Sequence, residues 1–556
     1  MSRSIPRPAI LLRVMLLAIA LIALPAARAV AASTQESWLE DDVSLYNDPA
    51  TTLAKLRLLG VTRVRVAVRW QLIAPDPLSR KRPKNFNAAN PAAYPAGTWR
   101  IWDEIVSDAT AAGISLDFDL LGGAPVWATG PGAPRDGKPH INWDPSPTEF
   151  GNFARAVATR YGGNYDPDTD SLAPGNASDL PKVSFWSVWN EPDYGPSLAP
   201  QGVLGHLKIE NSPRMYRNLV GAAWNALQAT GHTHDQLVIG ELAPRGAEFW
   251  GVFSGMKPLV FLRAMYCVDA NYKVLRGSAA RIRGCPTNAA GSRRFRAQNP
   301  GLFRAAGVAD HPYMRWYQPN KEQFPDPDST SLGEIGNLTR ALDRLQRVYG
   351  SHKRYPIYNS EFGYITSPPK HPSKKTPWVN QNKAALYLNW AEYISWRNPR
   401  IRSFSQYLLY DPLPANSTDD FGGFASGLET FGKHARKATY TAWRLPVFMP
   451  VTSARRGRNL EVWGCVRPAP YAQDDTGGDL QTVKIQFQRG SRGAFRTLRT
   501  VTVSDPRGYF DVHLRFPGSG TVRLAWDYPT FDQALGYFDP LLPHTAYSRV
   551  VRLTLH

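Results

Sequence analysis

The chain has 556 residues and a formal net charge of +19. Because single hydrophobic cores stop growing at about 250 to 300 residues, this length excludes a one-core protein and predicts one large and one small domain. The basic balance would suit nucleic acid, an anionic envelope polymer or an acidic polysaccharide, but the lysines and arginines are scattered singly and form no nucleic-acid motif, which argues against nucleic acid.

Residues 1–32 have the layout of a secretory signal peptide. Arginines precede the apolar run 14–24, and small residues suited to cleavage follow near 29–32. The alternative is a membrane anchor, but the run is shorter than the roughly 18 to 20 residues that span a bilayer. We therefore expect export, cleavage of the signal, and a secreted, extracellular protein without a stable membrane span.

The segment 47–70 introduces an alternation of helix and strand signals. Asp48 suits the N-cap of a helix, Pro49 suits its first turn, and Gly60 suits the position after its end. The strand that follows alternates valine with arginine and alanine, which places the valines on one face. If the valines contact helices, the arginines, including Arg65, point inward.

This alternation continues to the end of the segment 33–445. Amphipathic segments separate eight stretches with strand signals, which are 37–43, 63–69, 114–121, 183–189, 237–242, 308–311, 356–360 and 401–409. Eight strand–helix units predict an α/β fold, a (β/α)8 TIM barrel. Active sites in this fold lie at the C-terminal ends of the strands.

Residues 446–556 have a different pattern. Short strands without intervening helices are separated by turns such as DPRG and PGSG, and the strands are 460–466, 483–488, 495–503, 509–516, 521–526 and 549–555. This pattern predicts a small C-terminal all-β sandwich, similar to immunoglobulin domains. No low-complexity linker precedes it, so we expect the two domains to pack closely.

The chain contains three cysteines. Cys267 and Cys285 lie 18 residues apart in one irregular part of the chain, which includes the stretch 271–300, whereas Cys465 stands alone. An oxidising compartment would allow Cys267 and Cys285 to form a disulfide, and the alternative is three buried thiols.

Carboxylates follow the fourth and the seventh predicted strands. The fourth strand runs into FWSVWNEPDYG, where Pro192 ends the strand directly after Asn190 and Glu191. The seventh runs into YPIYNSEFGYIT and ends at Glu361. A barrel brings both carboxylates to one rim, and cleavage of a glycosidic bond needs two converging carboxyl groups of different pKa. Strict alternation would direct Asn190 and Glu191 to opposite faces, so we expect a bulge or twist there.

The motif WNEP after the fourth strand and the motif SEFGY after the seventh resemble those of glycoside hydrolase clan A, the retaining TIM-barrel glycosidases. The resemblance covers about residues 37–445, and the local sequence is most similar to the cellulase-like families 5 and 39. It implies that Glu191 is the general acid/base and that Glu361 is the nucleophile that forms a glycosyl-enzyme intermediate. It also implies that Asn190 binds the 2-hydroxyl of the sugar.

Three further residues are implied in substrate binding near the nucleophile. The segment VRVAVRW looks like the second strand of family 5, where an arginine, here Arg65, keeps the nucleophile ionised, because a cation lowers the pKa of a carboxyl group. In ADHPYMRW, His311 and Tyr313 hold the positions where the clan places a histidine or tyrosine. Alternatively, Arg65 forms a structural ion pair and the other two are core residues.

Aromatic residues at strand ends are candidates for stacking on sugar rings. Trp70 follows the second strand and Trp127 follows the third, and each is as well suited to packing in the core. The eighth strand lacks the tryptophan common in family 5, so we expect Gln406, Tyr407 or Tyr410 to replace it, and we select Gln406.

Together these features predict a secreted retaining glycosidase that hydrolyses O-glycosyl compounds in a poly- or oligosaccharide by double displacement. We expect no metal and no organic cofactor, because two carboxylates and water suffice for this reaction. The alternatives are a non-catalytic carbohydrate-binding protein on a barrel scaffold and a transglycosylase. The basic charge favours an anionic or cell-envelope glycan, while the sugar, the linkage and the oligomeric state do not follow from the sequence.

Overall fold

The computed structural model describes residues 35–172, 178–248, 251–323, 325–371, 374, 376–413, 424–490, 492–528 and 545–556. The signal peptide expected over residues 1–32 lies outside the described residues. Within these ranges, no helix has both the length and the apolar character that crossing a membrane requires.

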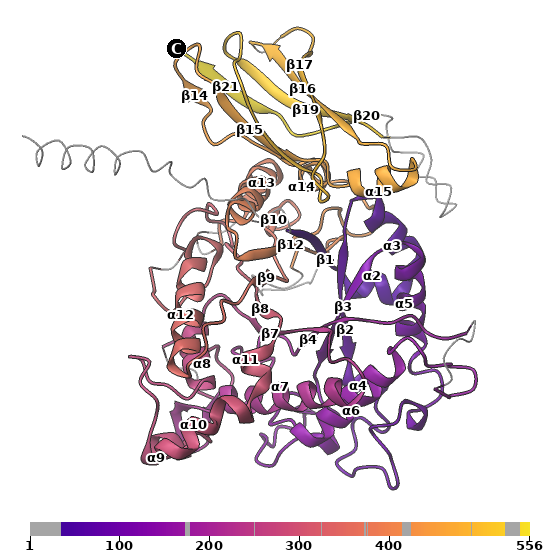
Figure 1. Ribbon diagram of the computed structural model, residues 1–556, viewed down its shortest axis with the longest axis vertical. Helices are drawn as coiled ribbons and strands as arrows, with labels where there is room; N and C mark the ends of the chain where they lie inside the picture. The colour runs from indigo at the N-terminus through magenta and orange to yellow at the C-terminus, as the bar shows by residue number, and fades with distance from the viewer. Residues whose placement is uncertain are drawn as a thin grey trace, which may run out of the picture.

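Eight parallel strands of the described chain close into a barrel, which confirms the predicted fold (Figure 1). The barrel strands are β1 (Glu36–Glu40), β2 (Arg63–Arg69), β3 (Ser115–Leu121), β4 (Phe185–Val188), β7 (Gln236–Leu242), β8 (Gly307–Asp310), β9 (Ile357–Asn359) and β12 (Ile401–Tyr407). Pairing of β1 with β12, with Ser37 opposite Phe404, closes the cylinder. The first strand ends earlier than predicted, because Asp41 accepts a hydrogen bond from the Ser44 backbone N–H and caps the next helix.

Helices surround the barrel. They are α2 (Asp42–Asn47), α3 (Pro49–Leu58), α4 (Trp70–Ile73), α5 (Arg100–Ala111), α6 (Pro147–Arg160), α7 (Ser212–Ala229), α8 (Pro258–Met265), α9 (Gly277–Ile282), α10 (Ala289–Gln298), α11 (Pro300–Arg304), α12 (Ile335–Val348), α13 (Gln381–Arg397) and α14 (Ala438–Arg444). As predicted, Asp48 caps α3, and its carboxylate accepts a hydrogen bond of 3.1 Å from the Thr51 backbone N–H. Gly60 follows α3 with a φ of 73°.

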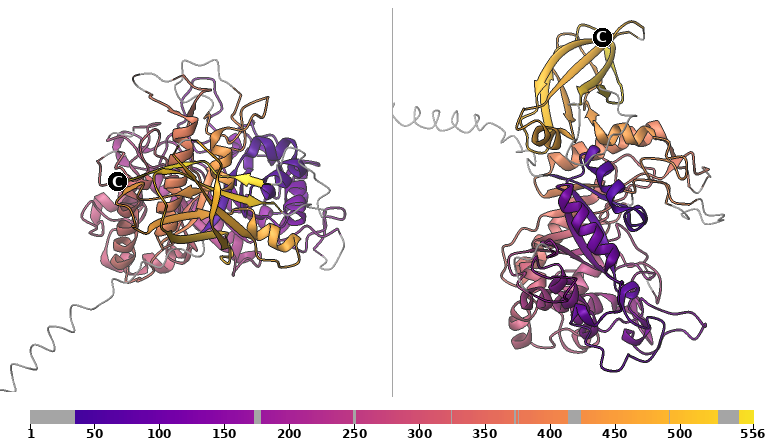
Figure 2. Two further views of the ribbon diagram at one scale, coloured as in Figure 1. Left: turned by 90° about the horizontal axis from the view of Figure 1, so that it is seen from above. Right: turned by 90° about the vertical axis from the view of Figure 1, so that its right-hand side faces the viewer.

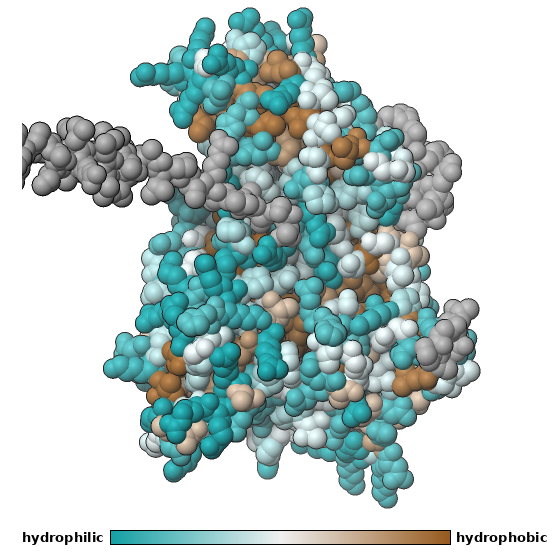
Figure 3. All heavy atoms as spheres, in the orientation of Figure 1, coloured by the Kyte–Doolittle hydropathy of each residue, from teal (hydrophilic) through white to brown (hydrophobic). Residues whose placement is uncertain are grey.

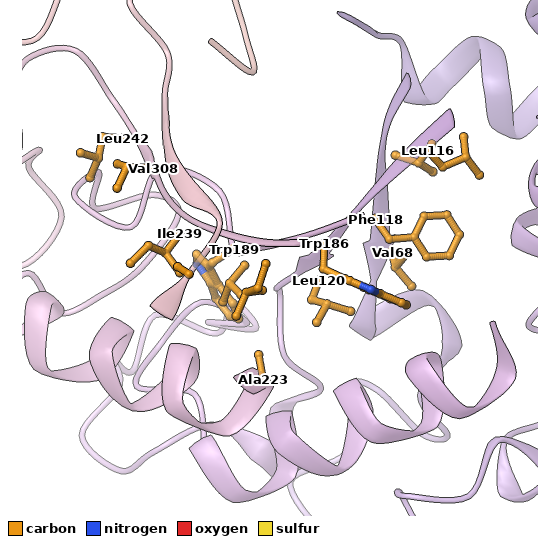
Figure 4. Close-up of a cluster of buried hydrophobic side chains, with 14 of the residues drawn as sticks. Val68, Leu116, Phe118, Leu120, Trp186, Trp189, Ala223, Ile239, Leu242 and Val308 are labelled. Carbon is orange, nitrogen blue, oxygen red and sulfur yellow. The ribbon is translucent and has the colours of Figure 1, made fainter. Parts of the chain in front are cut away.

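The strands bury their apolar side chains against the helix layer. In β2, Val64, Val66 and Val68 are fully buried among the core residues, and Arg65 points into the barrel. Figure 4 shows Val68 together with buried side chains of the neighbouring strands and Ala223 of α7. The prediction for β2 is therefore confirmed: its valines face the helices, and its charged Arg65 faces the inside of the barrel.

Aromatic side chains fill the N-terminal end of the barrel interior. Trp38 of β1, Phe185 of β4 and Tyr358 of β9 pack together, with ring centroids 5.3 to 5.7 Å apart. Val238 and Ala309 complete this cluster. Because side chains fill the N-terminal end of the barrel interior, a cavity between the strands can lie only toward their C-terminal ends.

The C-terminal region forms two sheets, and the all-β prediction is confirmed. One sheet contains β13 (Val447–Phe448), β15 (Leu460–Cys465) and β18 (Tyr509–Leu514), and the other contains β14 (Ser453–Ala454), β16 (Thr482–Arg489), β17 (Arg496–Thr502), β19 (Gly520–Asp527), β20 (Thr545–Tyr547) and β21 (Val551–Leu555). Side chains of both sheets, such as Val462 and Leu524, share one core. Figure 3 shows apolar residues exposed on this sandwich among hydrophilic ones.

The sandwich stacks on the N-terminal end of the barrel (Figure 2). Arg467, fully buried, donates to Glu392 of α13 at 2.6 Å and to Ser37 at the start of β1. Tyr509 donates to the same carboxylate at 2.9 Å and accepts from Gln35. This buried network fixes the sandwich at the end of the barrel opposite the carboxyl ends of the strands.

A short helix that the sequence analysis missed adds to this contact. Helix α15 (Ala469–Asp475) lies between two sandwich strands. Its Tyr471 donates a hydrogen bond of 2.8 Å to the Val61 carbonyl in front of β2, and Asp475 pairs with Arg57 of α3. Tyr471 and Asp475 of this helix thus contribute to the contact between the domains.

A disulfide joins Cys267 and Cys285, while Cys465 is a buried thiol. The stretch 271–300, interpreted as irregular from its sequence, contains the short helices α9 and α10. Arg217 of α7 donates to the Gly284 carbonyl at 2.8 Å and so connects this excursion to the barrel helices.

We expect the double replacement Cys267→Ser and Cys285→Ser to lower the free energy of unfolding by about 3 kcal/mol. The disulfide closes a loop in the unfolded chain and so reduces the conformational entropy that the chain gains on unfolding. Urea unfolding of the oxidised protein measures this, and Cys465→Ala, which removes a thiol outside any disulfide, is the matched control. Equal unfolding free energies of the oxidised wild type and the double variant would contradict the prediction.

Candidate active site

A cavity of about 920 Å³ lies at the C-terminal ends of the barrel strands. Its polar and charged lining residues near the strand ends include Glu40, Arg65, Asp119, Asn190, Glu191, Tyr313, Glu361 and Tyr407. They come from β1, β2 and β3, and from the segments that follow β4, β8 and β9 and the end of β12. Residues far apart in the sequence therefore converge on one space.

The backbone after β4 turns Asn190 and Glu191 to the same cavity. Trp189 and Glu191 have φ angles of 64° and 41°, in the left-handed region that residues other than glycine rarely adopt. The Glu191 backbone N–H donates to the Glu241 carbonyl at 2.9 Å, which holds the turn. These angles replace strict alternation and account for the twist expected at this strand end.

Glu361 is held on several sides. Its Oε1 accepts a hydrogen bond of 2.9 Å from Arg65 and lies 3.6 Å from Nε2 of His311, and its Oε2 accepts one of 3.1 Å from the Tyr313 hydroxyl. Burial raises the pKa of Glu361, while the charges of His311 and Arg65 oppose that rise. The two cations thus favour the ionised form of this carboxylate against the cost of its burial.

The His311 ring lies between three carboxylates and is itself fully buried. Nδ1 is 3.1 Å from Oε1 of Glu191, and Nε2 is 2.9 Å from Oε2 of Glu241. Burial lowers the pKa of His311, but the negative charges of Glu361, Glu191 and Glu241 outweigh it and raise the pKa well above its usual value. These surroundings favour the protonated ring, whose two nitrogens both face carboxylates.

Arg65 is the second cation among these carboxylates. One side of its guanidinium donates to Glu361 and to Glu40, and the other donates to Asp119 at 2.9 Å and to Oδ1 of Asn190 at 3.1 Å. Only 2% of the side chain is exposed, so these interactions replace water almost completely.

Three carboxylates of this site were missed in the sequence. Glu40 and Asp119 pair with Arg65, and Oε2 of Glu241 lies 3.3 Å from it. Glu241 would point outward in a regular strand, but β7 is irregular after Ile239, and Glu241 has a φ of 48°. The sequence signal was Gly240, because a glycine inside a strand often marks a bulge.

Two predicted stacking residues lie elsewhere. Trp70 is 1% exposed and packs on Phe150 and Phe153 of α6, and Trp127 packs on Phe86 and Trp70. Neither lines the cavity. The assignment of both to sugar contact is therefore corrected. Helix α4 begins directly after β2 and carries the Trp70 ring onto α6, while Trp127 lies in a helical turn, 126–128, beyond the end of β3 and packs on the Trp70 ring.

Gln406 is also corrected. Its side-chain amide donates to the backbone carbonyls of Ser426 at 2.7 Å and Tyr407 at 2.9 Å, and it does not line the cavity. Side chains alternate along β12, so Tyr407, the next residue, faces the interior and lines the cavity instead. Tyr410 contacts Lys55 and stacks on His434 outside it.

The charge on His311 gives a pH prediction. Its folded-state pKa is raised, so its contribution to stability is complete below about pH 6.5, the unfolded value, and is lost as the pH rises through the folded value. We expect His311→Asn to cost about 3 kcal/mol of unfolding free energy at pH 6 and less toward pH 10. Urea unfolding across this range measures the difference, and a pH-independent cost would indicate a neutral ring in the wild type.

The described part of the chain contains no group of three or more histidine, cysteine, aspartate or glutamate side chains arranged to hold a metal ion. Among the described residues, the last one in the sequence that lines the cavity is Phe424, so the sandwich contributes no lining residue. The site is therefore built by the barrel alone.

No protein-family model and no curated protein matches the sequence. Solved structures similar to this chain include a family 39 glycoside hydrolase from the gut symbiont Bacteroides cellulosilyticus WH2, with 14% identity, coverage of 95% of this chain and 81% of that chain, and a TM-score of 0.45. A β-glycosidase from Thermosphaera aggregans has 15% identity, coverages of 72% and 84%, and a TM-score of 0.43. An endo-β-1,4-mannanase from Thermotoga petrophila has 9% identity, coverages of 95% and 100%, and a TM-score of 0.38. The fold assignment rests on the strand order of this chain itself.

Proposed function

We propose that the protein is a retaining glycoside hydrolase of clan A, with Glu191 as general acid/base and Glu361 as nucleophile. The observation that carries the proposal is that both carboxylates line one cavity at the C-terminal ends of the barrel strands and contact the same imidazole ring, that of His311. Retaining glycosidases need two carboxyl groups on either side of the scissile bond.

The two carboxylates differ in ways that suit these roles. The Glu361 side chain is 10% exposed and is fixed by Arg65 and Tyr313, as an oriented nucleophile requires. The Glu191 side chain is 21% exposed, and it hydrogen-bonds to His311. Glu191 can therefore reach the oxygen of a leaving group in the cavity.

In the first step, a Glu361 oxygen attacks the anomeric carbon and the bond to the leaving oxygen breaks, while the carboxylic acid of Glu191 gives its proton to that oxygen. In the second step, Glu191 takes a proton from water, the water oxygen bonds to the anomeric carbon, and the ester bond to Glu361 breaks. The second inversion restores the original configuration.

Asn190 is suited to binding a sugar hydroxyl. Arg65 donates to its carbonyl oxygen, which fixes the orientation of the amide. The amide nitrogen is then left to donate to the 2-hydroxyl of the sugar, an interaction that strengthens in the transition state.

Export is part of the proposal. It is supported by the signal-like composition of residues 1–32 and by the disulfide between Cys267 and Cys285, since disulfides persist in oxidising compartments.

The test is incubation with a panel of 2-fluoro glycosides, which trap the covalent intermediate, followed by mass spectrometry. We expect one adduct that maps to Glu361 and is absent from Glu361→Gln. Binding to a glycan array without any adduct or turnover would favour a non-catalytic binding protein. Transfer to an added acceptor sugar in preference to water would identify a transglycosylase.

A further inference from the structure

Glu241 is a fully buried carboxylate that is bound through only one of its two oxygens. Its Oε2 accepts a hydrogen bond of 2.7 Å from the Ser360 hydroxyl and lies 2.9 Å from Nε2 of His311 and 3.3 Å from Arg65. Its Oε1 is also buried and makes no hydrogen bond to any residue that the structure describes. A buried carboxylate oxygen without a partner costs free energy, so stability alone does not account for this residue.

The backbone at Glu241 is strained as well. Its φ of 48° is one that residues other than glycine rarely adopt. Gly240 has a φ of 114°, and a Cβ atom there would lie 2.6 Å from the Ala309 carbonyl oxygen, so the bulge requires glycine. The Glu241 carbonyl accepts the hydrogen bond from the Glu191 backbone N–H. Strain of this kind concentrates at functional sites, and here the strained residue contacts both Glu191 and His311.

The His311 ring faces Glu241 and the two proposed catalytic carboxylates. Its Nδ1 is 3.1 Å from Glu191, and its Nε2 is 2.9 Å from Glu241 and 3.6 Å from Glu361. In a retaining mechanism, Glu191 is protonated before the first step and Glu361 is an ester after it, so each of them lacks its charge at one stage. Glu241 takes part in no bond change and stays an anion throughout.

We infer that Glu241 is a positioning residue that keeps a proton on Nε2 of His311 during the reaction, so that Nδ1 donates to Glu191 and the acidic proton of Glu191 is directed to the leaving oxygen. The inference rests on the proposed glycosidase function and adds a residue to its mechanism. In a neutral imidazole, one nitrogen is an acceptor. If Nε2 kept its proton for Glu241, a neutral Nδ1 would accept the proton of the Glu191 carboxylic acid and hold it away from the leaving group. The protonated ring offers no such acceptor.

Two further charged or titratable groups lie near the ring besides the three glutamates, and they are Arg65 and Asp310. Burial raises the pKa of Glu241, but the charge of Arg65 and the bond with His311 outweigh it, and the pKa is lowered. Burial raises the pKa of Asp310 to about 8, with the Thr330 hydroxyl and the charge of His311 opposing the rise. Near neutral pH, Glu241 is therefore ionised, whereas Asp310 is mostly protonated.

Protonation of the ring is measured by nitrogen NMR of protein labelled at histidine, in which His311 is the signal missing from His311→Asn. We expect both ring nitrogens of the wild type to carry protons at pH 7, and Glu241→Gln to lower the midpoint of deprotonation by about one pH unit or more, because it removes an adjacent negative charge. The matched control is Glu392→Gln, the same change at a fully buried glutamate in the contact between barrel and sandwich, and it should leave the midpoint unchanged. An unchanged midpoint in Glu241→Gln would overturn the inference. A neutral His311 ring in the wild type at pH 7 would also overturn it, and this measurement needs no folded Glu241→Gln.

The effect on catalysis is measured with two glycosides of the sugar whose 2-fluoro derivative labels Glu361. A methyl glycoside needs protonation of its leaving group, whereas a dinitrophenyl glycoside does not. We expect Glu241→Gln to lower kcat/KM for the methyl glycoside by about tenfold or more at pH 7, with little change for the dinitrophenyl glycoside. The deficit should shrink toward pH 5, where His311 is protonated in the variant too.

An equal loss of kcat/KM for both leaving groups at every pH would show a merely structural role of Glu241 and overturn the inference, while the proposed function would stand. A wild type that neither hydrolyses nor is labelled by any glycoside would overturn the proposed function. The NMR midpoints would still decide in that case whether Glu241 keeps the proton on His311.

Discussion

Replacement of Glu361 by glutamine is expected to lower kcat for any good glycoside substrate by about five orders of magnitude. The amide has nearly the same shape but cannot attack the anomeric carbon, so no covalent intermediate forms. Its oxygen still accepts from Arg65 or Tyr313, which keeps the cavity close to its present form. Steady-state kinetics and circular dichroism on the same preparation measure both effects.

A matched control is Glu104→Gln, which makes the same change in a side chain of α5 that is 44% exposed. We expect kcat of this variant to equal that of the wild type. Full activity of Glu361→Gln would exclude Glu361 as nucleophile, whereas loss of activity together with loss of the folded spectrum would show a structural role instead.

The barrel could be predicted from the sequence because eight stretches with strand signals alternate with segments of helical pattern. β2 shows this: its valines pack on helices, and Arg65 points inward as expected. The positions of Glu191 and Glu361 follow from the same rule, since strand ends define the rim.

The rest of the site depends on local backbone geometry. Glu241 enters the site only because β7 bulges at Gly240, and Glu40 and Asp119 take part only because neighbouring strands bring them to Arg65. The strand-end rule predicts where a residue lies along the barrel but not where its side chain points. For this reason the strand-end rule assigned Trp70 and Gln406 to the cavity. The Trp70 ring instead packs on α6, and the Gln406 amide donates to backbone carbonyls.

Arg65→Ala is expected to lower the free energy of unfolding at pH 8 by about 3 to 5 kcal/mol, the cost of leaving buried charges uncompensated. Four carboxylates lie within 3.3 Å of the Arg65 guanidinium, and the side chain is 2% exposed. Burial already raises the pKa of Glu40 and of Asp119, with Arg65 opposing the rise in each case. Without Arg65 these values rise further above those of the unfolded chain.

The sign of the pH dependence follows from these shifts. Carboxyl groups whose folded-state pKa is raised destabilise the fold at high pH, and protonation relieves that cost as the pH falls. We therefore expect the deficit of Arg65→Ala to shrink between pH 8 and pH 5 in urea unfolding, whereas Arg100→Ala, whose side chain is 68% exposed, should cost at most about 1 kcal/mol at either pH. A deficit that stayed constant or grew on acidification would mean that the carboxylates around Arg65 are already protonated in the native protein, and the electrostatic account of the site would fail.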